Sequence, residues 1–142
     1  MSEVTAQWWQ WHLDNMPPTE GYYFIQSANA STRSIETYDT VPHTKQIVVP
    51  VINWISLSSR RDDSMLELAR REIKDTIQTI KSNIPYKYIE SDYFKLRDGR
   101  DAVSCGYWIV RQLDKGSHTI DTFGSCRNGT ISLTQKHRID VL

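Results

Sequence analysis

The chain carries no excess of either charge and no long hydrophobic run. Lys and Arg number 17, and so do Asp and Glu, which gives a formal net charge of zero. Nucleic acids and anionic membrane surfaces attract proteins through a basic excess, so neither is expected as a partner. No apolar run approaches the ~20 residues that a membrane helix requires. The N-terminal residues also lack the basic and apolar regions of a secretory signal, which predicts a cytoplasmic protein.

The residues that commonly ligate metals are few and scattered. The spacings typical of zinc sites, such as two cysteines separated by two residues, do not occur. No phosphate-binding loop, dinucleotide-binding fingerprint or nucleophile-elbow pattern is present either. We therefore expect neither a metal nor a cofactor. The histidines and cysteines are His12, His43, His118, His137, Cys105 and Cys126.

Aromatic residues are plentiful by contrast, with five Trp and seven Tyr in the chain. Many of them lie in alternating or apolar runs that favour strands. Turn signals separate these runs at intervals of about eight to twelve residues, which is typical of a β-sandwich or jelly roll. Asn128-Gly129 is the strongest of them, since this pair suits the tight turn of a hairpin. The predicted strands cover residues 21–26, 34–41, 45–57, 86–96, 102–113, 117–126, 130–135 and 137–142.

Residues 64–83 have the periodicity of an amphipathic α-helix. Ser64 and Glu67 form a capping box at its start, and Pro85 prevents its continuation. Ile73 and Ile77, in its apolar stripe, are expected in the core. The stripe consists of Leu66, Ala69, Ile73, Ile77, Ile80 and Ile84.

Residues 6–14 predict a second, short helix that places Trp8, Trp11 and His12 on one side. Pro17 and Pro18 cannot continue it.

These patterns predict a mainly β fold in a single domain, residues 1–142. We expect an antiparallel β-sandwich of jelly-roll type with one amphipathic helix packed across it. Pro50 lies in the most apolar run and predicts a bulge or an edge there. Residues 114–116 are interpreted as a hairpin turn. Such a hairpin would bring Cys105 near Cys126, as reduced thiols in a cytosolic protein.

Several segments, in the same order along the chain, resemble an uncharacterised family of bacterial and archaeal proteins. That family has no established activity, so the resemblance implies the fold and leaves the mechanism open. Two features depart from the family pattern: the Asp-Gly-Cys segment is shortened, and Cys105 replaces the usual Asp. The matching segments are Trp8 and Trp11, "VPHTKQIVVPVIN" (41–53), Ser91 with Phe94, and "GYWIVRQLDKGSHTI" (106–120).

His118 lies in a predicted strand on the same face as Ile120, which suggests that its side chain points inward. One hypothesis is a core histidine whose ring nitrogen is hydrogen-bonded. The other is a general base at the bottom of a jelly-roll cavity. Its candidate helpers are Tyr107, Glu20, Glu36 and Asp121.

The tryptophans suggest a different role. Trp8 and Trp11 would lie on one side of the short helix and Trp9 on another, so the chain would struggle to bury all three. An exposed Trp commonly stacks on a ligand or a partner surface. The alternative is that the three residues seal an open end of the sandwich or lie in a homo-oligomer interface. Trp108 would complete an aromatic-lined concavity.

Two functions remain open at this point. The leading hypothesis is a non-enzymatic module that binds a small molecule or a protein partner, with Trp8, Trp9, Trp11 and Trp108 in contact with it. The alternative is a small cofactor-independent hydrolase, lyase or cyclase that uses His118 as general base. A closed-off pocket that contains His118 with a carboxylate in reach would favour the enzyme, whereas a filled interior with exposed Trp8 or Trp9 would favour the binding module.

Overall fold

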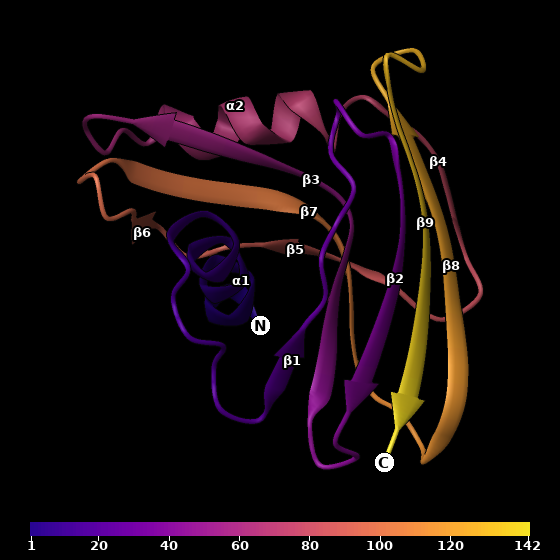
Figure 1. The fold of residues 1–142 in the computed structure, drawn as a ribbon. Helices are drawn as coiled ribbons and strands as arrows, with labels where there is room; N and C mark the ends of the chain where they lie inside the picture. The colour runs from indigo at the N-terminus through magenta and orange to yellow at the C-terminus, as the bar shows by residue number, and fades with distance from the viewer.

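Two β-sheets pack face to face, and two helices lie against the larger one (Figure 1). The computed structural model describes residues 1–142. The larger sheet has the strand order β1-β3-β7-β5, with β6 also paired to β7, and the smaller has the order β2-β9-β8-β4. The elements are α1 (Ser2–Asp14), β1 (Tyr22–Phe24), β2 (Ser34–Val41), β3 (Gln46–Ser58), α2 (Ser64–Glu72), β4 (Ile77–Ser82), β5 (Lys87–Glu90), β6 (Phe94–Lys95), β7 (Asp101–Gln112), β8 (Gly116–Cys126) and β9 (Ile131–Val141).

The predicted β-sandwich is confirmed, but its sheets are mixed rather than purely antiparallel. β1 pairs with β3 in parallel, and β2 pairs with β9 in parallel. The remaining pairs are antiparallel. The predicted hairpin at Asn128-Gly129 joins β8 to β9, and both residues have the positive φ angles, 55° and 79°, that such a turn requires.

The hairpin predicted at residues 114–116 is wrong. β7 pairs with β3 along one edge and with β5 and β6 along parts of the other, and β8 pairs with neither edge of β7. The chain instead crosses to the smaller sheet, where β8 lies between β9 and β4. Cys105 therefore pairs with Trp54 and Glu90, whereas Cys126 lies in the other sheet, and both thiols are free.

The helix predicted for residues 64–83 is less than half as long in the structure. α2 ends at Glu72, and residues 77–82 form β4, which pairs with β8. Ile73 is buried, but Ile77 is only partly buried. The short N-terminal helix is confirmed as α1 and begins four residues earlier than predicted.

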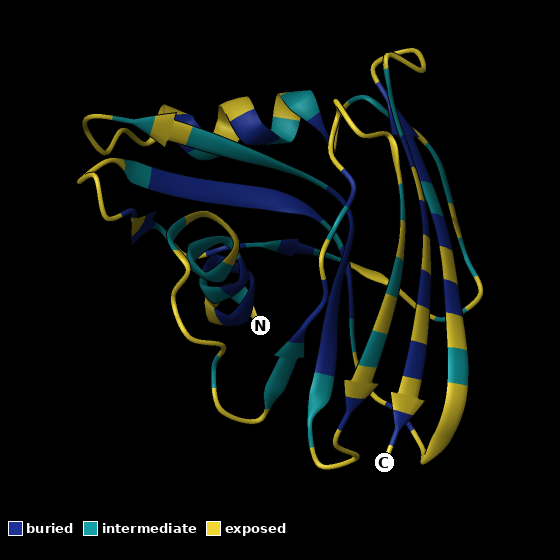
Figure 2. Cartoon of the chain, in the orientation of Figure 1, coloured by how far each residue is buried: buried dark blue, intermediate teal, exposed yellow.

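The core lies between the sheets and contains two polar side chains on β9, Gln135 and His137. Figure 2 shows how buried residues alternate with exposed ones along β9. The Gln135 amide donates to the carbonyl oxygens of Pro50 (2.8 Å) and Val51 (3.2 Å) and accepts from the Ala28 amide (3.0 Å). The strand register shifts between Pro50 and Ile52, which confirms the predicted bulge. The Gln135 amide thus hydrogen-bonds with backbone carbonyl groups at the bulge.

Candidate ligand-binding site

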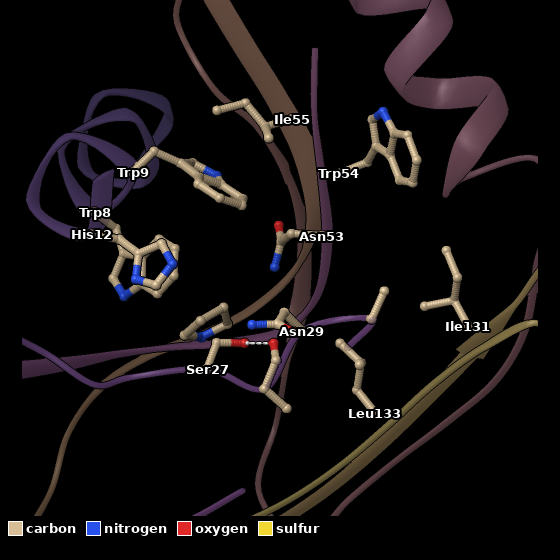
Figure 3. Close-up of a pocket in the computed structure, with 13 residues that line it drawn as sticks. Trp8, Trp9, His12, Ser27, Asn29, Asn53, Trp54, Ile55, Ile131 and Leu133 are labelled. Carbon is tan, nitrogen blue, oxygen red and sulfur yellow. Dashed lines mark hydrogen bonds between the residues drawn. The ribbon is translucent and has the colours of Figure 1, made fainter. Parts of the chain in front are cut away.

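A surface cavity of about 250 Å³ lies between α1, the loop after β1, the bent part of β3 and the start of β9 (Figure 3). Aromatic and aliphatic side chains form most of its wall. The lining residues are Trp8, Trp9, His12, Ser27, Ala28, Asn29, Ala30, Pro50, Asn53, Trp54, Ile55, Ile131 and Leu133.

Helix α1 supplies one wall of the cavity through residues spaced three or four apart. Trp8 and His12 are one turn apart, and their rings stack at 4.8 Å with 17° between the planes. Trp8 is almost fully buried and is fixed by a 2.9 Å hydrogen bond from its indole nitrogen to the carbonyl oxygen of Ile25. The Trp9 ring meets the edge of Trp8 at 5.1 Å. The helix is therefore anchored to the sheet by one indole and presents the next to the cavity.

Two polar atoms in the residues of the cavity wall have no hydrogen-bond partner. They are the indole nitrogen of Trp9 and the Oδ1 atom of Asn53, and both are buried. Figure 3 shows the Trp9 ring extending from α1 toward Asn53 on β3. A buried polar atom without a partner costs about 1–3 kcal/mol. A donor and an acceptor left without partners beside one cavity are groups that a bound molecule could satisfy.

Asn53 occupies its position because the residue paired with it is a glycine. Gly106 lies opposite Asn53 in the β3–β7 ladder, and a Cβ atom there would overlap Oδ1 of Asn53 and the carbonyl oxygen of Ile52. The Asn53 amide also donates a 3.2 Å hydrogen bond to the carbonyl oxygen of Tyr107. The Gly106-Tyr107 pair thus holds the Asn53 side chain in place.

The cavity wall carries no Asp, Glu, Lys or Arg. His12 is the one residue of the cavity wall whose side chain can carry a charge. The ring face against Trp8 is desolvated, and this lowers the pKa of His12 below 6.5, although a hydrogen bond with Gln26 opposes the effect. Arg127 lies 6.0 Å from the Trp54 ring centroid but is paired with Glu72 at 2.8 Å and does not line the cavity. The site is therefore electrically neutral near pH 7.

Of the four tryptophans predicted to contact a ligand, the structure places Trp8 and Trp9 at the cavity. Trp11 packs against Phe24 at 5.7 Å, and Trp108 is fully buried with its ring 5.5 Å from Trp8. The indole nitrogen of Trp108 also lacks a partner, but Trp108 does not line the cavity. Trp11 and Trp108 instead pack against Trp8, which does line it.

His118 lies near the start of β8, with its Nε2 atom 2.6 Å from the carbonyl oxygen of Asp114. The ring is half-buried, so the expected protein hydrogen bond is present but the expected full burial is not. It borders a second, mostly polar depression across β2, β8 and β9. This depression is not the aromatic cavity, and none of the 13 residues around that cavity is a neighbour of His118 in the ladder.

The structure does not bring the candidate helpers together around His118. Glu36 is exposed and pairs with Arg138 at 3.3 Å on the outer face of its sheet. Tyr107 lies in the middle of β7 in the other sheet, 5.3 Å from the Tyr88 ring. Glu20 is exposed before β1, and Asp121 is exposed on β8, on the face opposite to Ile120.

Asn53, Trp54 and His12 line the cavity, although none of them was predicted from the sequence to contact a ligand. One signal was available: Asn53 is a lone amide at the end of the apolar run 47–52, where a buried strand seldom carries a polar side chain without a reason. The loop that supplies Ser27 to Ala30 carried no such signal.

No cluster of three or more His, Cys, Asp or Glu side chains is placed to hold a metal ion. No helix is long and apolar enough to cross a membrane.

Comparison with known proteins adds little. No family model matches the chain, and no curated protein matches it. Among solved structures, it is similar to the extracellular cadherin domains 1–4 of protocadherin gamma B7, at 12% identity and a TM-score of 0.27. That similarity covers 75% of this chain and 24% of that chain, so the chain spans about a quarter of its length. A similarity this weak carries no argument, and the resemblance to the uncharacterised family stays a prediction.

Proposed function

We propose that this protein is a binding module that holds a small molecule in the aromatic cavity beside α1. The observation that carries the proposal is the coincidence of stacked aromatic rings with two unpartnered polar atoms at one concave site. Ligand sites are commonly apolar concavities with a few polar groups that fix orientation. The cavity volume of about 250 Å³ suits a small ligand rather than a polymer.

The alternative function, an enzyme with His118 as general base, has weaker support. No carboxylate is hydrogen-bonded to the His118 ring, and the nearest partner of Nε2 is a backbone carbonyl. A general base needs the substrate within hydrogen-bond reach, and the depression beside His118 is lined mainly by exposed polar residues. A cytoplasmic location is part of the proposal and is supported by two buried cysteines that form no disulfide.

The site is tested by filling the cavity from its edge. Ala30 is exposed and lines the cavity, whereas the neighbouring Ser31 is exposed and does not. Ala30→Trp should block binding, and Ser31→Trp is the matched control. The measurement is saturation-transfer NMR with indole, phenol, benzamide and methyl glucoside as probes.

We expect at least one of these probes to bind the wild type and Ser31→Trp and to lose binding in Ala30→Trp. Thermal unfolding of each variant verifies that the fold is retained. Binding that is equally strong in Ala30→Trp would place the ligand elsewhere, and the absence of binding by all four probes would contradict a small-molecule site of this kind.

A further inference from the structure

The cavity constrains the chemistry of its ligand, and the following inference rests on the proposed function. Volume is the first constraint. An apolar cavity of about 150 Å³ holds one benzene molecule. In proportion, the cavity beside α1, at about 250 Å³, has room for a fused two-ring molecule.

The shape and charge of the wall are the second constraint. The rings of Trp9 and Trp54 and the stacked pair of Trp8 and His12 contribute flat aromatic surface. Flat rings pack best on such surface through stacked or edge-to-face contacts. No ionised side chain lines the cavity, so a charged ligand would lose its hydration without gaining a counter-charge. A neutral, planar molecule is therefore favoured.

The unpartnered atoms are the third constraint. The Trp9 indole nitrogen is a donor without an acceptor, and Oδ1 of Asn53 is an acceptor without a donor. Both atoms are covered in the ligand-free chain. The Trp9 ring must rotate to expose its N–H group, and the Asn53 side chain, which Gly106 and Tyr107 hold, must shift off the Gly106 backbone to expose Oδ1. A ligand that carries an acceptor and a donor close together would satisfy both atoms at once.

We propose that the cavity binds a neutral, planar, two-ring cyclic amide, with its carbonyl oxygen accepting from the Trp9 N–H group and its own N–H group donating to Oδ1 of Asn53. The cyclic amide places one acceptor beside one donor on a single edge. The rings fill the apolar part of the cavity against the tryptophans. The Gly106 position contributes indirectly, because it leaves room for the Asn53 oxygen.

Oxindole is the simplest probe of this class. Its binding is measured by calorimetry and by the indole N–H signals of the five tryptophans in a proton–nitrogen correlation spectrum. We expect the Trp9 signal to shift downfield when oxindole binds, and the Trp11 signal to move little. N-methyloxindole lacks the donor and should bind at least about tenfold more weakly. Naphthoate is planar but charged and should not bind detectably.

Trp9→Phe keeps an aromatic ring and removes the N–H group, and Trp11→Phe is the matched control on the same helix. We expect Trp9→Phe to weaken oxindole binding about three- to tenfold, the loss of one neutral hydrogen bond. Its melting temperature should stay close to that of the wild type, because the N–H group has no partner in the ligand-free chain. Trp11→Phe should leave the affinity unchanged.

The outcomes separate this inference from the proposed function. If one of the probes in the Ala30→Trp experiment binds at the cavity but oxindole does not, the ligand class is wrong and the binding function stands. Equal affinities for oxindole and N-methyloxindole, or for the wild type and Trp9→Phe, would also overturn the hydrogen-bonding scheme. Oxindole binding that survives in Ala30→Trp would overturn the site itself.

Discussion

His137 shows how strongly one residue can be affected by its surroundings. It lies on β9 with no exposed surface, and its Nδ1 atom is 2.6 Å from the Thr37 hydroxyl, while Nε2 has no partner. Burial lowers the pKa of His137 from 6.5 to about 4, although Asp39 and Asp121 act in the opposite direction. The folded chain therefore holds this imidazole neutral over a range in which the unfolded chain protonates it.

The lowered pKa predicts a loss of stability in acid. Because the unfolded state binds more protons between pH 6.5 and pH 4, the free energy of unfolding should fall as the pH drops through that window. The part due to His137 is roughly 3 kcal/mol at full protonation. His137→Leu should flatten this part of the pH profile, measured by urea unfolding at a series of pH values. His43→Leu, at an exposed histidine, is the control, and a profile that keeps its slope in His137→Leu would contradict the assignment.

At the scale of elements, residues 64–84 explain both a success and a failure of sequence analysis. Residues Ile73, Ile77, Ile80 and Ile84 fit a helical period, and the helix start at Ser64 was predicted correctly. Beyond residue 75, however, the same segment is rich in β-branched residues, which also suit a strand. Pairing with β8 along five registered positions decides the conformation, and no local pattern reveals a partner forty or more residues away.

The packing of Ile73, just after the end of α2, predicts how much stability the chain loses when this side chain is truncated. Ile73, just after the helix, has no exposed surface and packs with Ile52 and Leu133, whereas Leu68 on the outer face of α2 is 48% exposed. Ile73→Ala should lower the free energy of unfolding by about 2–5 kcal/mol, the cost of deleting a large buried aliphatic side chain. Leu68→Ala makes a comparable truncation and should cost less than about 1 kcal/mol. Urea unfolding of the two variants measures the difference, and equal losses would show that the helix is oriented differently.

At the scale of the whole molecule, the division into two sheets separates the cysteines. Cys105 and Cys126 belong to different sheets, have no exposed surface, and have pKa values raised mainly by burial. Both thiols should therefore resist alkylation in the native state and react fully once the chain is denatured without a reducing agent. Mass spectrometry after each treatment counts the adducts. A chain that takes up no label after denaturation would contain the disulfide that the structure lacks.

Much of the architecture was accessible from the sequence, while the site was accessible only in part. Alternating or apolar runs located β2, β3 and β7, because each strand buries one face or both, and the Asn128-Gly129 pair located the hairpin between β8 and β9. The sheet to which a strand belongs depends on partners that are distant in sequence. The crossing of the chain from the larger sheet at β7 to the smaller sheet at β8 was therefore not predicted. Trp8 and Trp9 attracted attention by their number, but Asn53 and Trp54 became cavity residues only through the bend of β3 at Pro50.

The parallel pairing of β2 with β9 has a consequence for how the protein folds. Paired residues such as Ser34 and Thr134 are a hundred positions apart, and β9 is the sole strand partner of β2. The backbone amide of Ala28 likewise needs Gln135 on β9 as its hydrogen-bond acceptor. During synthesis, β2 must therefore wait as an unpaired strand until residues 131–141 have left the ribosome. Contacts this far apart in sequence slow the folding reaction, so the smaller sheet should assemble late, after residues 131–141 have been synthesised.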